Sequence, residues 1–141
     1  MKYIIYIGST VKLMNEAELA DMLVVNQQSN RLSNITGMLI YVDGTFIQVL
    51  EGNEEDVKKA GRKMERNTSH KNIIKLAEDN LAKPNFRTWS MAFLASNRAV
   101  VEKLEGYINP ESSNFLNTDS THAAIVLLKN FAKSNRVSYA L

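Results

Sequence analysis

The chain has 141 residues, of which 45% are hydrophobic and 23% charged, a composition typical of one ordinary globular domain. The net charge of +2 is small and its signs are interspersed, so we expect no nucleic-acid partner, and the absence of cysteine excludes disulfides and thiolate chemistry. With two histidines far apart in the sequence and no apolar run near the roughly 20 residues of a membrane span, we expect a cytoplasmic protein without a metal site.

The first part of the chain predicts a strand, a helix and a β-hairpin. Residues 3–9 (YIIYIGS) are apolar at successive positions, which indicates a strand covered on both faces. Asn15 and Glu18 have the spacing of a capping box that begins a helix. An apolar strand over 35–42 precedes the Asp-Gly pair at 43–44, which predicts a type I′ turn because both central residues need positive φ.

The next segments predict the return strand of the hairpin, a second helix and two more strands. The return strand, TFIQVLEG, covers 45–52, and Asn53 can begin the helix that follows. Gly61 inside this helix costs about 1 kcal/mol relative to alanine, which indicates that another group approaches it closely. Segments 72–82 and 86–95 have strand character.

The resulting order, β-α-β-β-α-β-β, is an α+β, ferredoxin-like arrangement with one added strand. Two more helices are predicted, over 98–105 and 120–133, and the second would turn Ile125, Leu128 and Phe131 inward. Strands that are apolar on both faces need two covering layers. We therefore expect the first two helices on one face of the sheet and the C-terminal pair on the other.

A candidate polar cluster lies inside this apolar framework. Strand alternation places Phe46, Gln48 and Leu50 on one face, and burial of the Gln48 amide without partners would cost about 1–3 kcal/mol. Tyr6 on the first strand and Asn30 near the end of the first helix can converge on it. Each residue alone is more often structural, but together they could hold a planar ligand with polar edges. Patterning alone leaves the function open, because this fold hosts many activities.

Three segments resemble the BLUF family, blue-light sensors that use FAD: IIYIGS, SNRLSNITGMLIYVDGTFIQVLEG and FRTWSMAF. The resemblance covers roughly residues 2–95 with matching order and spacing. It implies a flavin-binding domain over 1–96 and a helical extension over 97–141 packed on the same domain. This organisation is similar to that of the short PixD-type members, which carry no enzymatic effector domain, so we expect no enzyme activity.

The resemblance also implies roles for individual residues. Tyr6 matches the tyrosine that donates an electron and a proton to the excited flavin. Gln48 matches the glutamine that rearranges its hydrogen bonds between that tyrosine and flavin N5 and C4=O, and Asn30 matches the asparagine at the polar edge of the ring. The other implied cofactor contacts are Met22, Asn26, Phe46, Lys63 and His70, and the implied signal-relay residues are Trp89 and Met91.

Some positions depart from the family pattern. Gly8 and Asn26 stand where serine is common. Asn67 and Ser69 replace the acidic residue and the arginine of a D-x-R-H pattern, and Pro84 replaces an arginine. None of these changes removes Tyr6, Gln48 or Asn30. We therefore expect the photochemistry to survive with altered flavin affinity or recovery kinetics.

The sequence thus predicts a photoreceptor with non-covalent FAD and output through protein–protein contact. We expect a homo-oligomer, either a dimer or a larger ring, and a downstream protein whose identity the sequence does not give. The amphipathic last helix and the apolar tail 137–141 (VSYAL) could support self-association or could only cap the sheet. The alternatives are a flavin-dependent oxidoreductase and a cofactor-free ferredoxin-like regulatory module.

Overall fold

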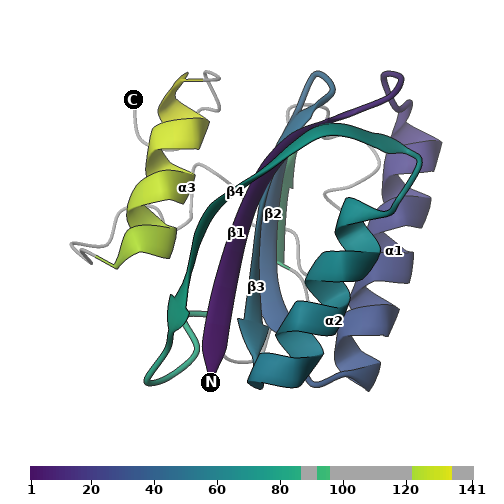
Figure 1. Ribbon diagram of the computed structural model, residues 1–141. Helices are drawn as coiled ribbons and strands as arrows, with labels where there is room; N and C mark the ends of the chain where they lie inside the picture. The colour runs from purple at the N-terminus through teal and green to yellow at the C-terminus, as the bar shows by residue number, and fades with distance from the viewer. Residues whose placement is uncertain (87–91, 96–121, 135–141) are drawn as a thin grey trace.

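The computed structural model describes residues 1–86, 92–95 and 122–134 (Figure 1). These residues form strands and helices in the following chain order: β1 (Lys2–Thr10), α1 (Glu16–Leu32), β2 (Thr36–Val42), β3 (Thr45–Gly52), α2 (Glu54–Glu65), β4 (His70–Asn80), β5 (Ala92–Ala95) and α3 (Ala123–Ser134).

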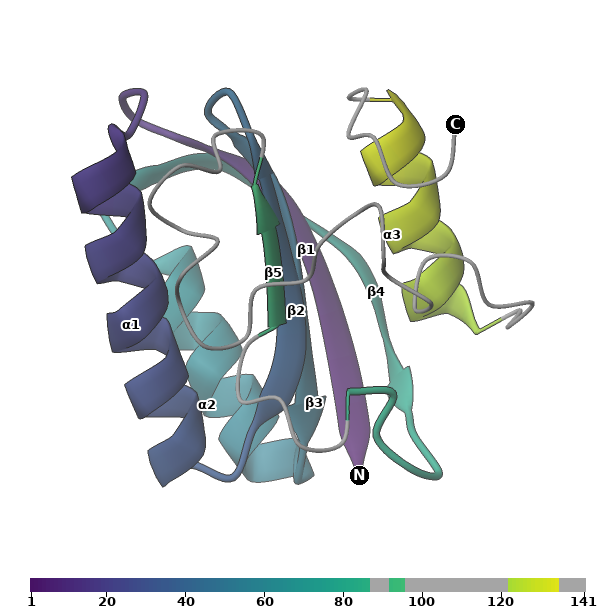
Figure 2. The same cartoon turned by 180° about the vertical axis from the view of Figure 1, so that it is seen from behind.

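The strands form one sheet in the order β4-β1-β3-β2-β5. The first four strands are antiparallel to their neighbours, whereas β5 runs parallel to β2 (Figure 2). The predicted α+β class and the β-α-β-β-α-β-β order are confirmed. In the β1–β3 register the Cα of Tyr6 lies opposite that of Gln48, so the two side chains start from neighbouring points on the same face.

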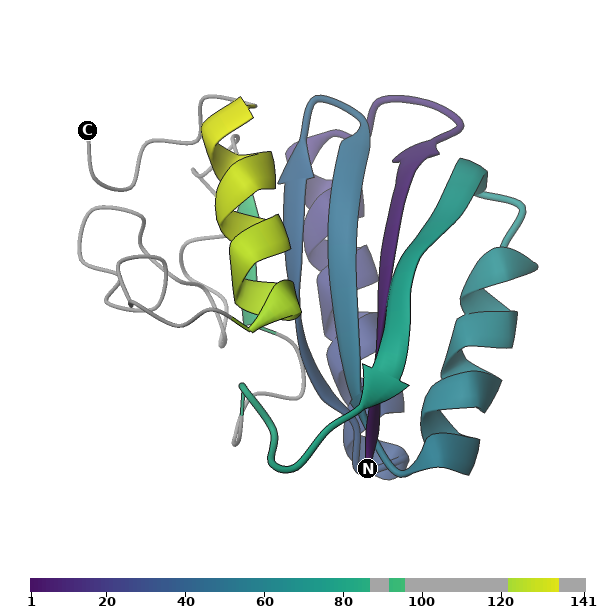
Figure 3. The same ribbon diagram turned by 60° about the vertical axis from the view of Figure 1, so that its left-hand side comes forward.

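Helices cover both faces of the sheet, with α1 and α2 on one face and α3 on the other (Figure 3). Ile4 and Tyr6 of β1 belong to the apolar core on the α1–α2 face, and Tyr3 and Ile5 to the core on the α3 face. The inward-facing side chains predicted for the last helix are buried in the second core: Ile125, Leu128 and Phe131. The two apolar faces predicted for the first strand therefore have two separate covering layers.

The local signals for turns and helix ends are confirmed with one exception. The Asn15 side chain accepts a hydrogen bond from the Glu18 backbone N–H (2.9 Å), and the Glu18 carboxylate accepts one from the Asn15 N–H (3.3 Å). Asp43 and Gly44 both have positive φ, as the type I′ turn requires. Asn53 is the residue before α2, but its side chain makes no capping hydrogen bond.

Glu51 fixes the chain segment that follows β4. This side chain is completely buried, and its carboxylate accepts hydrogen bonds from the Thr36 hydroxyl (2.9 Å), the Asn85 backbone N–H (2.7 Å), the Asn85 side chain (2.9 Å) and the Phe86 backbone N–H (3.1 Å). Through Glu51, residues 85–86 are thus hydrogen-bonded to the strand that also carries Gln48.

Several predicted features lie outside the described residues. The strand expected over 86–95 is described from Ala92 to Ala95, and Trp89 and Met91 fall in the part that is not described. The same holds for the helix expected over 98–105 and for the tail 137–141.

Within the described ranges, no helix has the length and apolar character needed to cross a membrane. The same ranges contain no group of three or more histidine, aspartate or glutamate side chains placed to hold a metal ion.

Candidate functional site

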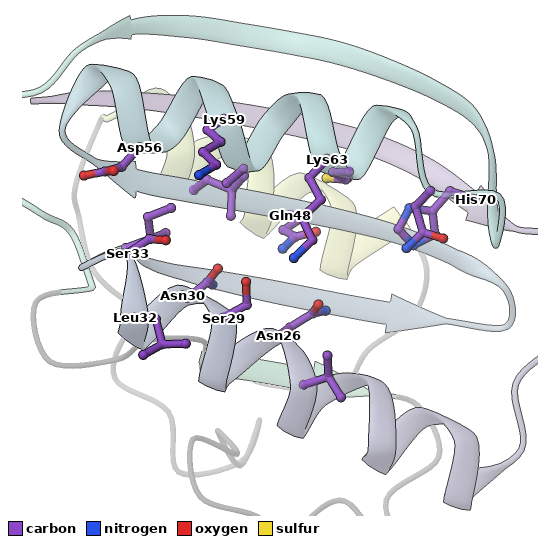
Figure 4. A pocket seen from close by; sticks show the side chains of 16 residues that line it. Asn26, Ser29, Asn30, Leu32, Ser33, Gln48, Asp56, Lys59, Lys63 and His70 are labelled. Atoms are coloured by element: carbon purple, nitrogen blue, oxygen red, sulfur yellow. The ribbon is translucent and has the colours of Figure 1, made fainter.

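A cleft of about 340 Å³ opens between α1 and α2, over the face of β3 that carries Gln48 (Figure 4). This volume falls within the range of small-molecule sites, about 300–1,000 Å³. The α1 wall is mostly amide and hydroxyl, the α2 wall carries ammonium groups, and His70 closes one end. Apolar side chains complete the lining: Val25, Leu32, Ile35, Leu50, Ala60 and Met64.

The α1 wall is a polar stripe in helical spacing. Asn26, Ser29, Asn30 and Ser33 recur at intervals of three and four residues, which places them on one side of the helix, facing the cleft (Figure 4). Asn30 is only 6% exposed although it lies at a cleft wall. The wall therefore presents three half-buried polar side chains, Asn26, Ser29 and Ser33, beside the buried Asn30.

Gln48 forms the floor of the cleft at the middle of β3 (Figure 4). Its side chain is 8% exposed, and among the described residues none hydrogen-bonds to its carboxamide. A carboxamide has two N–H donors and an oxygen acceptor, which a buried site normally satisfies. The polar atoms of Gln48 are thus available to a ligand in the cleft.

The α2 wall contributes positive charge. Lys59 and Lys63 are one helical turn apart and both extend into the cleft (Figure 4). Neither ammonium group forms an ion pair with a described residue, and Asp56 is the acidic side chain on this wall. The excess of cationic groups favours a ligand with an anionic portion.

His70 joins the main cleft to a smaller hollow lined by Met22, Phe46 and Tyr41. Its ring lies 4.9 Å from that of Phe46, centroid to centroid. Burial lowers the pKa of His70, although a hydrogen bond with the Met64 backbone acts in the opposite direction. In the described part of the chain, the Nδ1 atom of His70 is buried without a hydrogen-bond partner, so a neutral ring offers one more polar atom to a ligand.

Tyr6 lies beneath α2 and not on the cleft wall. Its side chain is 1% exposed, and its hydroxyl donates a hydrogen bond to Oε1 of Glu65 at 2.9 Å. Burial raises the pKa of the Tyr6 phenol, and the Glu65 carboxylate raises this pKa further. A Cβ atom at Gly61 would lie 2.6 Å from the Tyr6 oxygen, which explains the glycine that the sequence placed inside this helix.

The structure thus gathers most of the predicted cofactor contacts. The main cleft is lined by Asn26, Asn30, Gln48, Lys63 and His70, and the adjoining hollow by Met22 and Phe46. Tyr6 neighbours Gln48 in the sheet, but its hydroxyl points to Glu65.

Sequence reasoning missed the cleft residues Ser29, Ser33, Asp56 and Lys59, and it missed Glu65 at the end of α2. Ser29 and Lys59 could have been found by helical spacing from Asn26 and Lys63. No local signal marks Glu65, because its role depends on the packing of α2 over β1.

The structure shows the contacts of two residues that depart from the family pattern. Gly8 packs against the side chains of Ile73 and Phe46, so a serine there would require Ile73 to move. Asn67 lines the cleft, and its side chain accepts a hydrogen bond from the Ser69 backbone N–H (2.8 Å).

Comparison with known protein families identifies the family of this chain. The family described as "BLUF: Sensors of blue-light using FAD" matches residues 1–92. The chain belongs to the BLUF family. It is a blue-light sensor domain of the type that uses a flavin, as the sequence resemblance predicted.

Related proteins match mainly over this domain. Photoactivated adenylate cyclase subunit alpha of Euglena gracilis is 35% identical over 69 residues, which are 49% of this chain and 7% of the relative. The blue light- and temperature-regulated antirepressor BluF of Escherichia coli K12 is 34% identical over 62 residues, 44% of this chain and 15% of the relative. This chain therefore spans a small part of the curated relatives it matches.

A solved structure matches over almost the whole chain. The photo-activated state of BlsA superposes with a TM-score of 0.62 at 26% identity, covering 96% of this chain and 94% of BlsA. Similarity to the cyclase subunit is confined to 7% of its length, whereas BlsA is comparable in length to this chain.

The residues of the cleft fit a flavin. The open carboxamide of Gln48 and the unpartnered Nδ1 of His70 can meet polar ring atoms, while Phe46 and Met22 offer apolar contact. The two lysines suit a phosphorylated tail.

Proposed function

We propose that this chain is a blue-light photoreceptor that binds FAD non-covalently between α1 and α2 and switches through Tyr6 and Gln48. The observation that carries the proposal is the buried Gln48 carboxamide, which faces the cleft and has no hydrogen-bond partner among the described residues. Asn30 and His70 support it as further polar groups at the same cleft.

When bound, the flavin supplies absorption of blue light and an excited state that accepts an electron. Tyr6 is the proposed source of the electron and of a proton from its hydroxyl. Gln48 then exchanges one set of hydrogen bonds for another, by rotation of its amide or by tautomerism. Its donors and acceptor are free of other described partners, so both arrangements are open to it, which suits a bistable switch with a gap of a few kcal/mol.

We propose that the signal leaves the site along β3 and the segment that follows β4. Glu51, three residues after Gln48, holds Asn85 and Phe86 through its carboxylate. Asn85 and Phe86 are followed in the sequence by Trp89 and Met91, the proposed relay residues. Output would then occur by protein–protein contact, without enzymatic turnover.

We also propose that residues 97–141 form an extension of the flavin-binding domain 1–96, and that the protein self-associates as a dimer or a larger ring. Support for the first point comes from α3, whose Ile125 and Leu128 pack in one core with Tyr3 and Ile5. Multi-angle light scattering on the flavin-loaded chain, in darkness and under blue light, measures the oligomeric state.

The decisive experiment is a visible spectrum of the purified chain before and after blue light. We expect a yellow protein whose flavin band moves reversibly to the red and recovers in darkness. A protein that stays colourless after incubation with FAD would refute the proposal. Flavin reduction by NADPH with turnover would favour an oxidoreductase instead.

Two substitutions test the assigned residues. Gln48→Leu and Tyr6→Phe should each bind flavin but lose the normal red shift, because each removes one hydrogen-bonding partner of the switch. Normal switching in both variants would show that the site assignment is wrong.

A further inference from the structure

A small hollow adjoins the main cleft at the level of Gln48, and we call it the inner hollow. Its volume is about 10 Å³, which is room for one water molecule and far less than a flavin ring needs. Five polar side chains line it: Thr10, Asn26, Tyr41, Gln48 and His70. Asn26, Gln48 and His70 also line the main cleft, so the two spaces share a polar wall.

His70 contributes a buried ring nitrogen to this region. In the described part of the chain, its Nδ1 atom is buried and has no hydrogen-bond partner. Buried polar atoms in native proteins are nearly always paired, either with a protein group or with an ordered water. Burial lowers the pKa of His70, and a hydrogen bond with the Met64 backbone raises it to a smaller extent. The ring is therefore neutral at pH 7, and a water molecule suits either tautomer because it can donate to Nδ1 or accept from it.

Three other side chains complete a set of partners for such a water. Asn26 and Gln48 line the inner hollow, and neither carboxamide has a hydrogen-bond partner among the described residues. The Thr10 hydroxyl donates to the Lys12 carbonyl (2.7 Å), which leaves the Thr10 oxygen as an acceptor. A buried water makes two to four hydrogen bonds, so the lining of the inner hollow supplies the usual number.

Water has its own route to the inner hollow from the protein surface. A larger hollow of about 360 Å³, which we call the outer hollow, opens between the β1–α1 connection and the α2–β4 connection. It shares Thr10, Met22 and His70 with the inner hollow. Its lining includes the ion pair of Lys12 with Glu18 (2.8 Å), so the charges there balance. A ligand that fills the main cleft therefore leaves this second route open.

We propose that the inner hollow binds one ordered water, hydrogen-bonded to His70 Nδ1, to Thr10 and to the amides of Asn26 and Gln48, and that this water takes part in the light switch. The switching role rests on the proposed function, in which Gln48 exchanges its hydrogen bonds. A carboxamide offers up to four hydrogen bonds, so Tyr6 and the flavin edge leave at least one for the water. When the amide rearranges, the group that it presents to the water changes, and the hydrogen bond of the water changes with it.

A crystal structure of the flavin-loaded chain, kept in darkness, tests the water site without photochemistry. We expect one ordered water about 2.7–3.2 Å from His70 Nδ1 and within the same distance of the Gln48 amide. The rival partner of Nδ1 is the flavin itself. A flavin atom bonded to Nδ1, or an inner hollow closed by side chains, would overturn the site.

Infrared difference spectra, light minus dark, test the switching role. Water labelled as H₂¹⁸O moves the O–H stretch of a participating water to lower frequency, so we expect one difference band that shifts with the label. Thr10→Val removes one partner of the water and should lower the amplitude of this band roughly fivefold, the effect of one lost hydrogen bond between neutral groups. Thr68→Val is the matched control and should leave the band unchanged, because Thr68 is exposed and lines the outer hollow but not the inner one.

The outcomes separate the water from the photoreceptor proposal. If the wild-type chain shows the red shift without a label-sensitive band, the switching role of the water is refuted while the proposed function stands. A band of equal amplitude in Thr10→Val would refute the placement of the water in the inner hollow. If the wild-type chain binds flavin without any red shift, the proposed function and the switching role fail together, and the crystal structure still decides the water site.

Discussion

Whether Gly61→Ala stabilises or destabilises the fold depends directly on the position of the Tyr6 hydroxyl. In an ordinary helix interior, the change from glycine to alanine stabilises by about 1 kcal/mol. Here the new Cβ would lie 2.6 Å from the Tyr6 oxygen, closer than real Cβ atoms approach a neighbour, and 3.5 Å from ring atoms Cε2 and Cζ. The clash is therefore with the oxygen, and the ring itself is at ordinary contact distance.

Two costs oppose the gain in helix propensity. Forcing a group into a packed core costs about 1–3 kcal/mol, and loss of a hydrogen bond to a charged group costs about 1.5–3 kcal/mol. Displacement of the Tyr6 oxygen incurs both costs, because the same atom donates to Glu65. We expect Gly61→Ala to lower the free energy of unfolding by about 2–4 kcal/mol, net of the gain in propensity.

Urea unfolding of the cofactor-free chain measures this quantity, and the Tyr6→Phe background is its internal control. Phenylalanine lacks the oxygen, so in that background Gly61→Ala should become neutral or stabilising by up to about 1 kcal/mol. The cycle therefore predicts a change of sign. If Gly61→Ala stabilises the wild-type chain, or destabilises both backgrounds equally, then the Tyr6 hydroxyl does not lie beneath Gly61.

Three further predictions concern other parts of the molecule. Glu51→Ala should lower the free energy of unfolding, measured by urea titration, by at least about 3 kcal/mol. The reason is that each buried donor left without an acceptor costs about 1–3 kcal/mol. A loss below about 1 kcal/mol would contradict this hydrogen-bond network. Burial lowers the pKa of His70 in the folded chain. Below the ordinary histidine pKa of about 6.5, the unfolded chain therefore binds more protons than the folded chain. The free energy of unfolding should accordingly fall as the pH drops from 7 toward 5. His70→Phe should flatten this profile in urea titrations at stepped pH, and an unchanged slope would refute the assignment. Lys59→Gln and Lys63→Gln should each weaken FAD binding roughly fivefold at low salt, since an exposed ion pair contributes up to about 1 kcal/mol. Titrations with FAD and riboflavin, with Lys58→Gln as control, check this: riboflavin, which lacks phosphate, should bind all variants equally.

The floor and one wall of the cleft were predictable because they follow from periodicity. Alternation along β3 places Gln48 on the same face as Phe46, and the four-residue interval between Asn26 and Asn30 places both amides on one side of α1. Burial of these polar groups is the physical signal, since a core strand rarely keeps an amide without a partner. The same spacing applied to Lys63 would have added Lys59.

The direction of the Tyr6 hydroxyl could not be predicted in this way. Alternation determines the face of β1 from which Tyr6 projects, and that face is confirmed by its packing with Ile4. It does not determine whether the oxygen turns toward Gln48 or under α2. Gly61 and Glu65 decide this, and they lie more than 50 residues away in the sequence. His70 is a similar case, because only the family resemblance indicated that the start of β4 would meet the end of the cleft.

The Tyr6 hydroxyl has one proton and two candidate acceptors, which gives the proposed switch an energy scale. A hydrogen bond to a charged group contributes about 1.5–3 kcal/mol and one to a neutral group about 0.5–1.5 kcal/mol, so Glu65 is favoured over Gln48 by about 1–2 kcal/mol. Such a gap leaves the minor arrangement at roughly 3–15% of molecules, a population that a ligand or a charge change can invert. Glu65→Gln replaces the charged acceptor by a neutral one, so this substitution should weaken the preference of the Tyr6 hydroxyl for Glu65 in the dark.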